Sequence, residues 1–102
     1  MKFTFHPEAL EEYREAARYY ETQRSGLGMS FIIEIEATIQ RIQEAPKRWH
    51  KIAEGIRSCR TRTFPYAVLY ATDSGVLHLI AVMHLHREPG YWRGRRATPP
   101  EP

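Results

Sequence analysis

The chain has 102 residues, 42% hydrophobic and 26% charged, which is room for one globular domain with an ordinary core. Its net charge is only +3, but residues 41–102 hold eleven Lys and Arg against five acidic residues, predicting a basic surface for an acidic protein segment or a nucleic acid. The single cysteine excludes an internal disulfide, and no apolar run suggests a signal peptide or a membrane helix, so a cytoplasmic protein without membrane contact is expected.

A short strand, Phe3-Thr4-Phe5, is expected to lead into a helix that begins at Pro7. Proline suits the first helical turn, because its missing N–H would have no partner there. Glutamates at 8, 11 and 12 place negative charge near the positive end of the helix dipole. The apolar stripe at helical spacing consists of Leu10, Tyr13, Ala17 and Tyr20, and Gly26 predicts the end of this helix.

A second helix is predicted after the turn at 24–28 and should end near Ala45, because Pro46 cannot continue it. Its apolar positions recur three and four residues apart: Phe31, Ile32, Ile35, Ile39 and Ile42. Two helices joined by a short glycine-containing turn predict an antiparallel hairpin.

The period changes after Gly55, where three strands are expected over residues 56–64, 66–72 and 76–85. The element order is then β-α-α-β-β-β. It predicts an α+β fold in which the helical hairpin packs on one face of a mainly antiparallel four-stranded sheet. Residues 1–96 should form the single domain, and the Pro-rich tail 97–102 should be disordered. The second face of the sheet is expected to stay open and to carry function.

Several motifs occur in one order along the chain. Gly26-Leu27-Gly28 joins the helices, Pro46 and Trp49 follow the second helix, and Arg57 opens the next strand. Phe64-Pro65-Tyr66 leads to Tyr70, and the last motif spans Ala81 to Arg95 with His84, Arg87, Pro89, Tyr91 and Trp92. Together they resemble the ParE/RelE toxin superfamily, specifically its ParE-like plasmid-stabilisation branch. The fold of that superfamily agrees with the element order predicted above.

The resemblance implies the toxin of a type II toxin–antitoxin system, neutralised by an antitoxin whose amphipathic C-terminal segment wraps around it. ParE-like members inhibit DNA gyrase, which is the favoured target here. RelE-like members cleave messenger RNA on the ribosome, which remains the alternative. The residues expected to bind the target or the antitoxin are Arg57, Arg60, Arg62, Tyr66, His84, His86, Arg87, Tyr91, Trp92 and Arg95.

RNA cleavage needs cations at the phosphorus and groups that move protons near neutral pH, which arginine cannot do. If the protein is a ribonuclease, the catalytic residues should be Arg57, Arg62, His84, Arg87 and Tyr91. RelE-like enzymes use a group of Lys and Arg residues and a C-terminal Tyr, and this chain has only three lysines. That incomplete set favours a toxin that acts by binding, without a reaction or a cofactor.

Several of these residues have a structural alternative. Arg57 could form an ion pair with Glu34 or Glu36, and Arg87 a salt bridge at the end of the sheet. His78, His84 and His86 should share one strand face, but without Cys, Asp or Glu at ligand spacing no metal site is expected. The two tryptophans are expected to brace the sheet rather than stack on bases. An open sheet face would also permit a homodimer.

Overall fold

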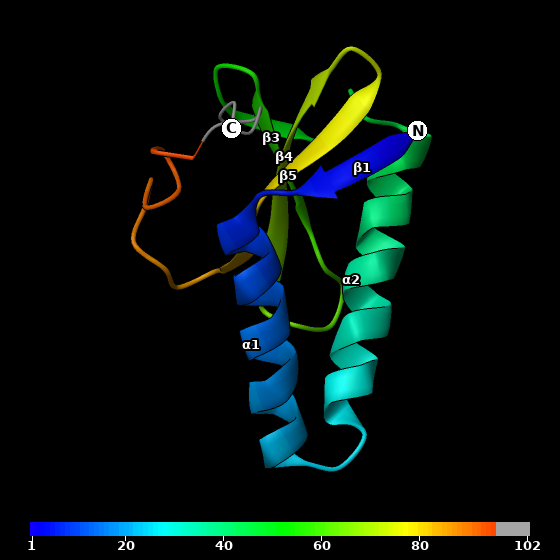
Figure 1. The fold of residues 1–102 in the computed structure, drawn as a ribbon, viewed down its shortest axis with the longest axis vertical. Helices are drawn as coiled ribbons and strands as arrows, with labels where there is room; N and C mark the ends of the chain where they lie inside the picture. Colours follow the sequence, from blue (N-terminus) through cyan, green and yellow to red (C-terminus); the bar gives the residue numbers. More distant parts are fainter. Residues whose placement is uncertain (96–102) are drawn as a thin grey trace.

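The computed structural model describes residues 1–95 and contains two helices packed on one face of a five-stranded sheet (Figure 1). The elements are β1 (Lys2–Phe5), α1 (Pro7–Gln23), α2 (Leu27–Glu44), β2 (His50–Ala53), β3 (Ile56–Arg60), β4 (Tyr66–Asp73) and β5 (Val76–His84). The predicted α+β class is confirmed. The domain limits at 96 and 97 lie outside the described residues and stay a prediction.

The helical hairpin follows from local chemistry at its ends. The His6 side chain accepts a hydrogen bond from the Glu8 N–H through Nδ1 at 3.1 Å, which caps α1. The Glu21 carboxylate accepts the N–H groups of Gly26 and Gly28 at 3.1 and 3.0 Å, which satisfies donors in the first turn of α2. Gly28 is needed because a Cβ there would lie 2.7 Å from the Ala17 carbonyl oxygen. The two helices therefore approach closely beside the turn.

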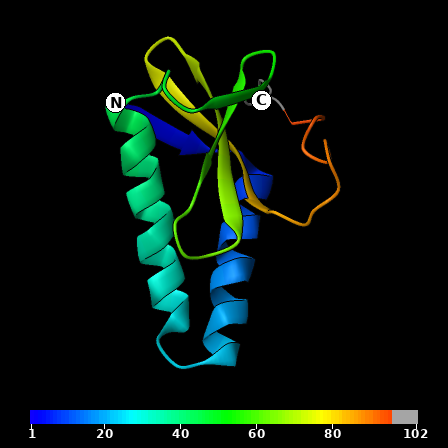
Figure 2. The same cartoon turned by 180° about the vertical axis from the view of Figure 1, so that it is seen from behind.

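The sheet has the order β1-β5-β4-β3-β2, in which β1 runs parallel to β5 and all other pairs are antiparallel (Figure 2). The mainly antiparallel arrangement was predicted, but the strand β2 was not. It is a four-residue edge strand, His50-Lys51-Ile52-Ala53, with a register shift against β3. So short a strand with two exposed polar residues has too little apolar alternation to be recognised from sequence.

A β-bulge at Ile80 divides β5. The register passes from Leu69↔Ala81 to Tyr70↔Leu79, which leaves Ile80 as an extra residue. Leu77, Leu79 and Val82 consequently face the helices, whereas Ile80 and Ala81 belong to a separate apolar cluster on the other face.

The prediction that His78 and His84 share a strand face is wrong. His78 lies between Leu77 and Leu79, which point to the helices, so it points away from them and contacts the Thr4 hydroxyl at 3.2 Å. His84 instead packs against Tyr66, which borders the helix-side core. The extra residue at the bulge reverses the alternation between the two histidines.

The sheet face away from the helices is not fully open, contrary to the prediction. Trp92 is only 5% exposed and packs on Ala67, Leu69, Ile80 and Ala81, so the segment after β5 covers this face at β4 and β5. An open groove of about 520 Å³ remains beside it, lined by Trp49, His50, Ile52, Ser58, Arg60, Met83 and Leu85. The sequence showed strands but gave no signal that residues 85–95 fold back over them.

Candidate functional site

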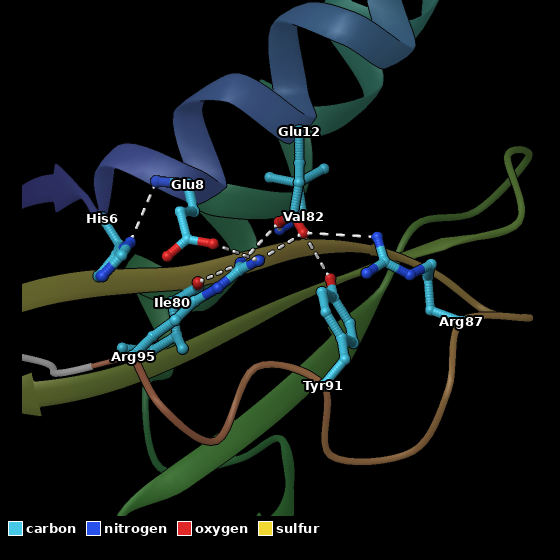
Figure 3. A network of polar contacts seen from close by, with 8 residues as sticks. All are labelled: His6, Glu8, Glu12, Ile80, Val82, Arg87, Tyr91 and Arg95. Atoms are coloured by element: carbon cyan, nitrogen blue, oxygen red, sulfur yellow. Dashed lines mark hydrogen bonds and ion pairs between the residues drawn. The ribbon is translucent and has the colours of Figure 1, made fainter.

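The Glu12 carboxylate on α1 takes the place of a strand beside the second half of β5. β1 ends at Phe5, so beyond Leu79 no strand of the described chain lies beside β5 on that side. There the N–H of Val82 donates to Glu12 Oε1 at 3.0 Å, and the carbonyl of Ile80 accepts from Arg95 at 3.0 Å (Figure 3). Side chains thus satisfy the backbone groups that a longer β1 would have paired.

Three residues of the C-terminal segment converge on this carboxylate, and we call Glu12, Arg87, Tyr91 and Arg95 the Glu12 cluster. Arg95 donates to both carboxylate oxygens at 2.9 Å, and the Tyr91 hydroxyl donates to Oε2 at 2.7 Å. The Arg95 side chain is 8% exposed. A bidentate guanidinium pair shielded from water is a strong, directional contact. It ties residues 91–95 to the first half of α1.

The pKa shifts of Tyr91 and Arg95 keep both side chains protonated, so that both can donate hydrogen bonds to Glu12. Burial raises the pKa of the Tyr91 hydroxyl, and the hydrogen bond to Glu12 and the charge of Glu12 raise it further. Tyr91 therefore remains a protonated donor at physiological pH. Burial alone would lower the pKa of Arg95, but the bond to Glu12 and the charge of that carboxylate outweigh it and leave this pKa raised.

Arg87 is the accessible cation of the Glu12 cluster. Its side chain is 51% exposed, and its Nη1 lies 4.0 Å from Glu12 Oε2. Its guanidinium carbon lies 3.8 Å from the centre of the Tyr91 ring. The Arg95 guanidinium carbon lies 5.0 Å from the same ring centre. In Figure 3 the Tyr91 ring stands between the two arginines, with Glu12 above it. Arg87 is therefore held by a ring contact and a carboxylate while part of its guanidinium faces solvent.

The two predicted histidines lie next to Arg87. The His84 and His86 ring centres are 5.0 Å apart, and the His86 N–H donates to His84 Nδ1 at 3.0 Å. His84 also contacts the Tyr66 ring. A shallow hollow of about 290 Å³ lies between α1 and the end of β5, lined by Glu12, Glu15, Ala16, Tyr19, Tyr66, Val82, His84 and Arg87. The structure thus brings together Tyr66, His84, His86, Arg87, Tyr91 and Arg95.

Arg57 lies at the other end of the sheet. It pairs in register with Tyr70, whereas His84 pairs with Tyr66, four residues away on β4. At about 3.3 Å per residue these positions are about 13 Å apart along the strand. Arg57 also points to the helix side, where its guanidinium donates to the Trp49 carbonyl at 2.8 Å. It makes no ion pair within residues 1–95, so the alternative of a pair with Glu34 or Glu36 is wrong.

Arg60 and Arg62 are also separate from the Glu12 cluster. Arg60 lines the open groove on the face away from the helices. Arg62 follows β3, and its backbone N–H donates to the Glu34 carboxylate, which also accepts from the Thr63 hydroxyl at 3.2 Å. Glu34 anchors this loop rather than pairing with Arg57. The five candidate catalytic residues of the ribonuclease hypothesis therefore lie at three separate places in the structure. Arg57 and Arg62 are each apart from the others, and His84, Arg87 and Tyr91 form one group.

The aromatic residues serve different contacts. Trp92 is buried in the cluster on the far sheet face, and Arg93 lies over its ring at 5.3 Å. Trp49 is half-buried, and its Nε1 donates to the Arg41 carbonyl at 3.4 Å.

Within the described 95 residues, no three His, Cys, Asp or Glu side chains gather as metal ligands would. None of the helices in that range is both long and apolar enough to cross a bilayer.

Sequence reasoning missed Glu12, which it treated only as a dipole partner of the first helix. The sequence held no clear signal for it, because the predicted apolar stripe lay at other positions. Only the structure shows that Ala9 and Ala16, three and four residues from Glu12 on the same helix face, are buried. A carboxylate on a buried stripe of small residues requires a partner.

A family model described as the ParE toxin of the type II toxin–antitoxin system parDE matches residues 3–89. The chain belongs to the ParE toxin family. A solved chain of the chromosomal ParDE TA system from P. aeruginosa has the same fold, with a TM-score of 0.70 at 10% identity, covering 82% of this chain and 95% of that chain. A search of curated protein sequences found no match. The resemblance seen in the sequence is thereby confirmed, although Tyr91, Trp92 and Arg95 lie beyond the matched residues.

Proposed function

We propose that this ParE-family protein arrests growth by binding and inhibiting DNA gyrase in the cytoplasm, and that a cognate antitoxin neutralises it. The family match carries the toxin assignment, because it spans residues 3–89 and the family is defined by such a system. The gyrase target goes further than that match. Gyrase is the target that the ParE-like resemblance implies, and the placement of charged and titratable side chains favours action by binding over RNA cleavage.

The scattered positions of the ribonuclease candidates favour binding over RNA cleavage. General acid–base catalysis requires proton-moving groups within hydrogen-bond reach of one reacting centre. Arg57, a candidate cation for the phosphorus, is about 13 Å along the sheet from the His84 position. Among the candidate proton-moving groups, the Tyr91 hydroxyl already donates to Glu12. The raised pKa of the Tyr91 hydroxyl also disfavours loss of its proton near neutral pH. A toxin that acts by contact needs only a fixed, accessible surface.

The basic second half supports an acidic partner. Arg60 and His50 border the open groove, whose remaining lining is largely apolar: Trp49, Ile52, Met83 and Leu85. An amphipathic antitoxin segment with acidic residues would match both properties. Residues 85–95 cover much of the adjoining sheet face, which leaves less apolar surface for a homodimer.

The test is inhibition of purified gyrase in an ATP-dependent supercoiling assay with relaxed plasmid. The wild-type protein should block supercoiling, and Arg87→Ala should weaken the inhibition by about tenfold, as for loss of one well-placed charged contact. Arg18→Ala is the matched control, because Arg18 is an exposed cation on α1 whose one ion pair within residues 1–95 is with Glu11, at 3.7 Å.

A cell-free translation reaction with the same proteins tests the alternative. Intact messages and continued synthesis support the gyrase target. Cut messages with unaffected supercoiling would establish an endoribonuclease instead, and the antitoxin would then protect the ribosome rather than gyrase.

A further inference from the structure

The accessible guanidinium of Arg87 is presented by a chain of contacts that begins on a different element. Glu12, in α1, accepts the Tyr91 hydroxyl at 2.7 Å, and the Tyr91 ring lies 3.8 Å from the Arg87 guanidinium carbon. β5 ends at His84, and within the described part of the chain residues 87–91 pair with no strand; the Arg87 N–H donates to the His84 carbonyl at 3.0 Å. Trp92 anchors the backbone of these residues on the far sheet face, whereas the contacts that orient the Arg87 side chain lead to Tyr91 and Glu12.

Glu12 is itself rigidly placed. Its carboxylate is 16% exposed and accepts from the Val82 backbone and from both terminal nitrogens of Arg95. The Val82 bond fixes the carboxylate against the sheet, and the Arg95 pair neutralises its charge. Since the Arg95 side chain is only 8% exposed, its cation is committed to this internal contact. Arg87, at 51% exposed, is left to meet a partner.

We propose that Glu12 is a positioning residue that fixes Tyr91 as a platform and thereby presents Arg87 in one orientation to an acidic group of the target. This proposal rests on the function proposed above and adds a residue to it. A guanidinium stacked on a ring keeps its outer edge free for two parallel hydrogen bonds to a carboxylate. Holding it still before binding removes part of the ordering cost of the complex.

The functional arm compares the concentrations that half-inhibit gyrase supercoiling for Glu12→Gln, Arg87→Ala and the double variant. Each single change should raise that concentration by about tenfold, and the double variant should be no weaker than Arg87→Ala alone, because both remove the same contact. Independent losses that multiply to about a hundredfold would overturn the proposal. Glu11→Gln is the control, since Glu11 is exposed on the same helix turn and, among the described residues, forms an ion pair with Arg18 alone.

A spectroscopic arm does not depend on gyrase. The Arg87 guanidinium carbon lies 3.8 Å from the centre of the Tyr91 ring, so the NMR signal of the adjacent Hε proton should carry a ring-current shift in the wild type and in Glu11→Gln. Glu12→Gln should remove that shift and speed hydrogen exchange at the Val82 amide. A retained shift in folded Glu12→Gln would overturn the positioning role.

Tyr91→Phe provides a second test of the proposal in case Glu12→Gln does not fold. It keeps the ring but removes the donor to Glu12, so it should reproduce the weaker inhibition and the altered Arg87 signal. An unchanged Arg87 signal and unchanged inhibition would overturn the proposal. If the wild type leaves gyrase unaffected, the proposed function fails and with it the target half of this inference, whereas the NMR comparison still decides whether Glu12 positions Arg87.

Discussion

Replacing Arg95 by methionine should cost about 3 kcal/mol of unfolding free energy, because it breaks a shielded ion pair from one side. The change removes two hydrogen bonds of 2.9 Å to Glu12 and one of 3.0 Å to the Ile80 carbonyl. It leaves the Glu12 carboxylate, 16% exposed, with only Val82, Tyr91 and the more distant Arg87. The contact of Arg95 with Glu8 at 3.6 Å adds little, since Glu8 is 67% exposed.

For a chain of this length, a loss of about 3 kcal/mol corresponds to a fall of about 15 °C in the melting temperature. Urea unfolding followed by tryptophan fluorescence and thermal melting followed by circular dichroism measure the two quantities. Trp92 reports directly on the segment that Arg95 holds.

Arg93→Met is the matched control, because Arg93 belongs to the same segment but is exposed, lies over the Trp92 ring and has no ion pair within residues 1–95. It should cost no more than about 1 kcal/mol. Equal losses in the two variants would refute the claim that Arg95 ties the segment to α1. Adding Glu12→Gln to Arg95→Met should restore part of the stability, because the unpaired charge is then gone.

Three further changes test other parts of the fold. Tyr70→Phe removes the hydroxyl that donates to the Pro46 carbonyl at 2.6 Å and should cost about 1 kcal/mol near neutral pH in urea unfolding. Burial raises the pKa of Tyr70 to about 12 from 10.0, so its contribution is complete below pH 10 and lost as the pH rises towards 12; the variant should show a shallower alkaline loss of stability. Gly28→Ala should destabilise by about 2 kcal/mol in thermal melting, because its Cβ would collide with the Ala17 carbonyl, whereas alanine at the unobstructed glycine 94 should not. Glu34→Ala should speed amide hydrogen exchange in the loop after β3 with a loss of about 1 kcal/mol, and unchanged exchange would show that the carboxylate does not anchor that loop.

The sequence alone predicted the helical hairpin and every strand except β2, because each carries a local signal, although β3 ends at Arg60 and not at Phe64 as predicted. Pro7 and Pro46 bound the helices, glycines mark the turns, and the change of period after Gly55 separates helix from strand. The family was also recognisable, since motifs in a fixed order do not depend on knowing their contacts.

The candidate site could be predicted only as a list of side chains. Tyr66, His84, Arg87, Tyr91 and Arg95 were identified as chemistry-bearing residues and do lie together. The list also included Arg57, which lies at the opposite end of the sheet because it pairs with Tyr70 in the register of β3 and β4. Spacing along the chain cannot separate these positions, because the distance depends on which residues pair across strands.

Only the tertiary structure decided the rest. Because of the extra residue at Ile80, His84 and His78 lie on opposite faces of the sheet, and no local sequence pattern predicts such a bulge. The sheet partner missing beyond Phe5 left the Val82 N–H and the Ile80 carbonyl to be satisfied from elsewhere. Glu12 and Arg95 satisfy them although 83 residues separate the two in sequence, and that contact exists only once α1, β5 and the C-terminal segment have packed.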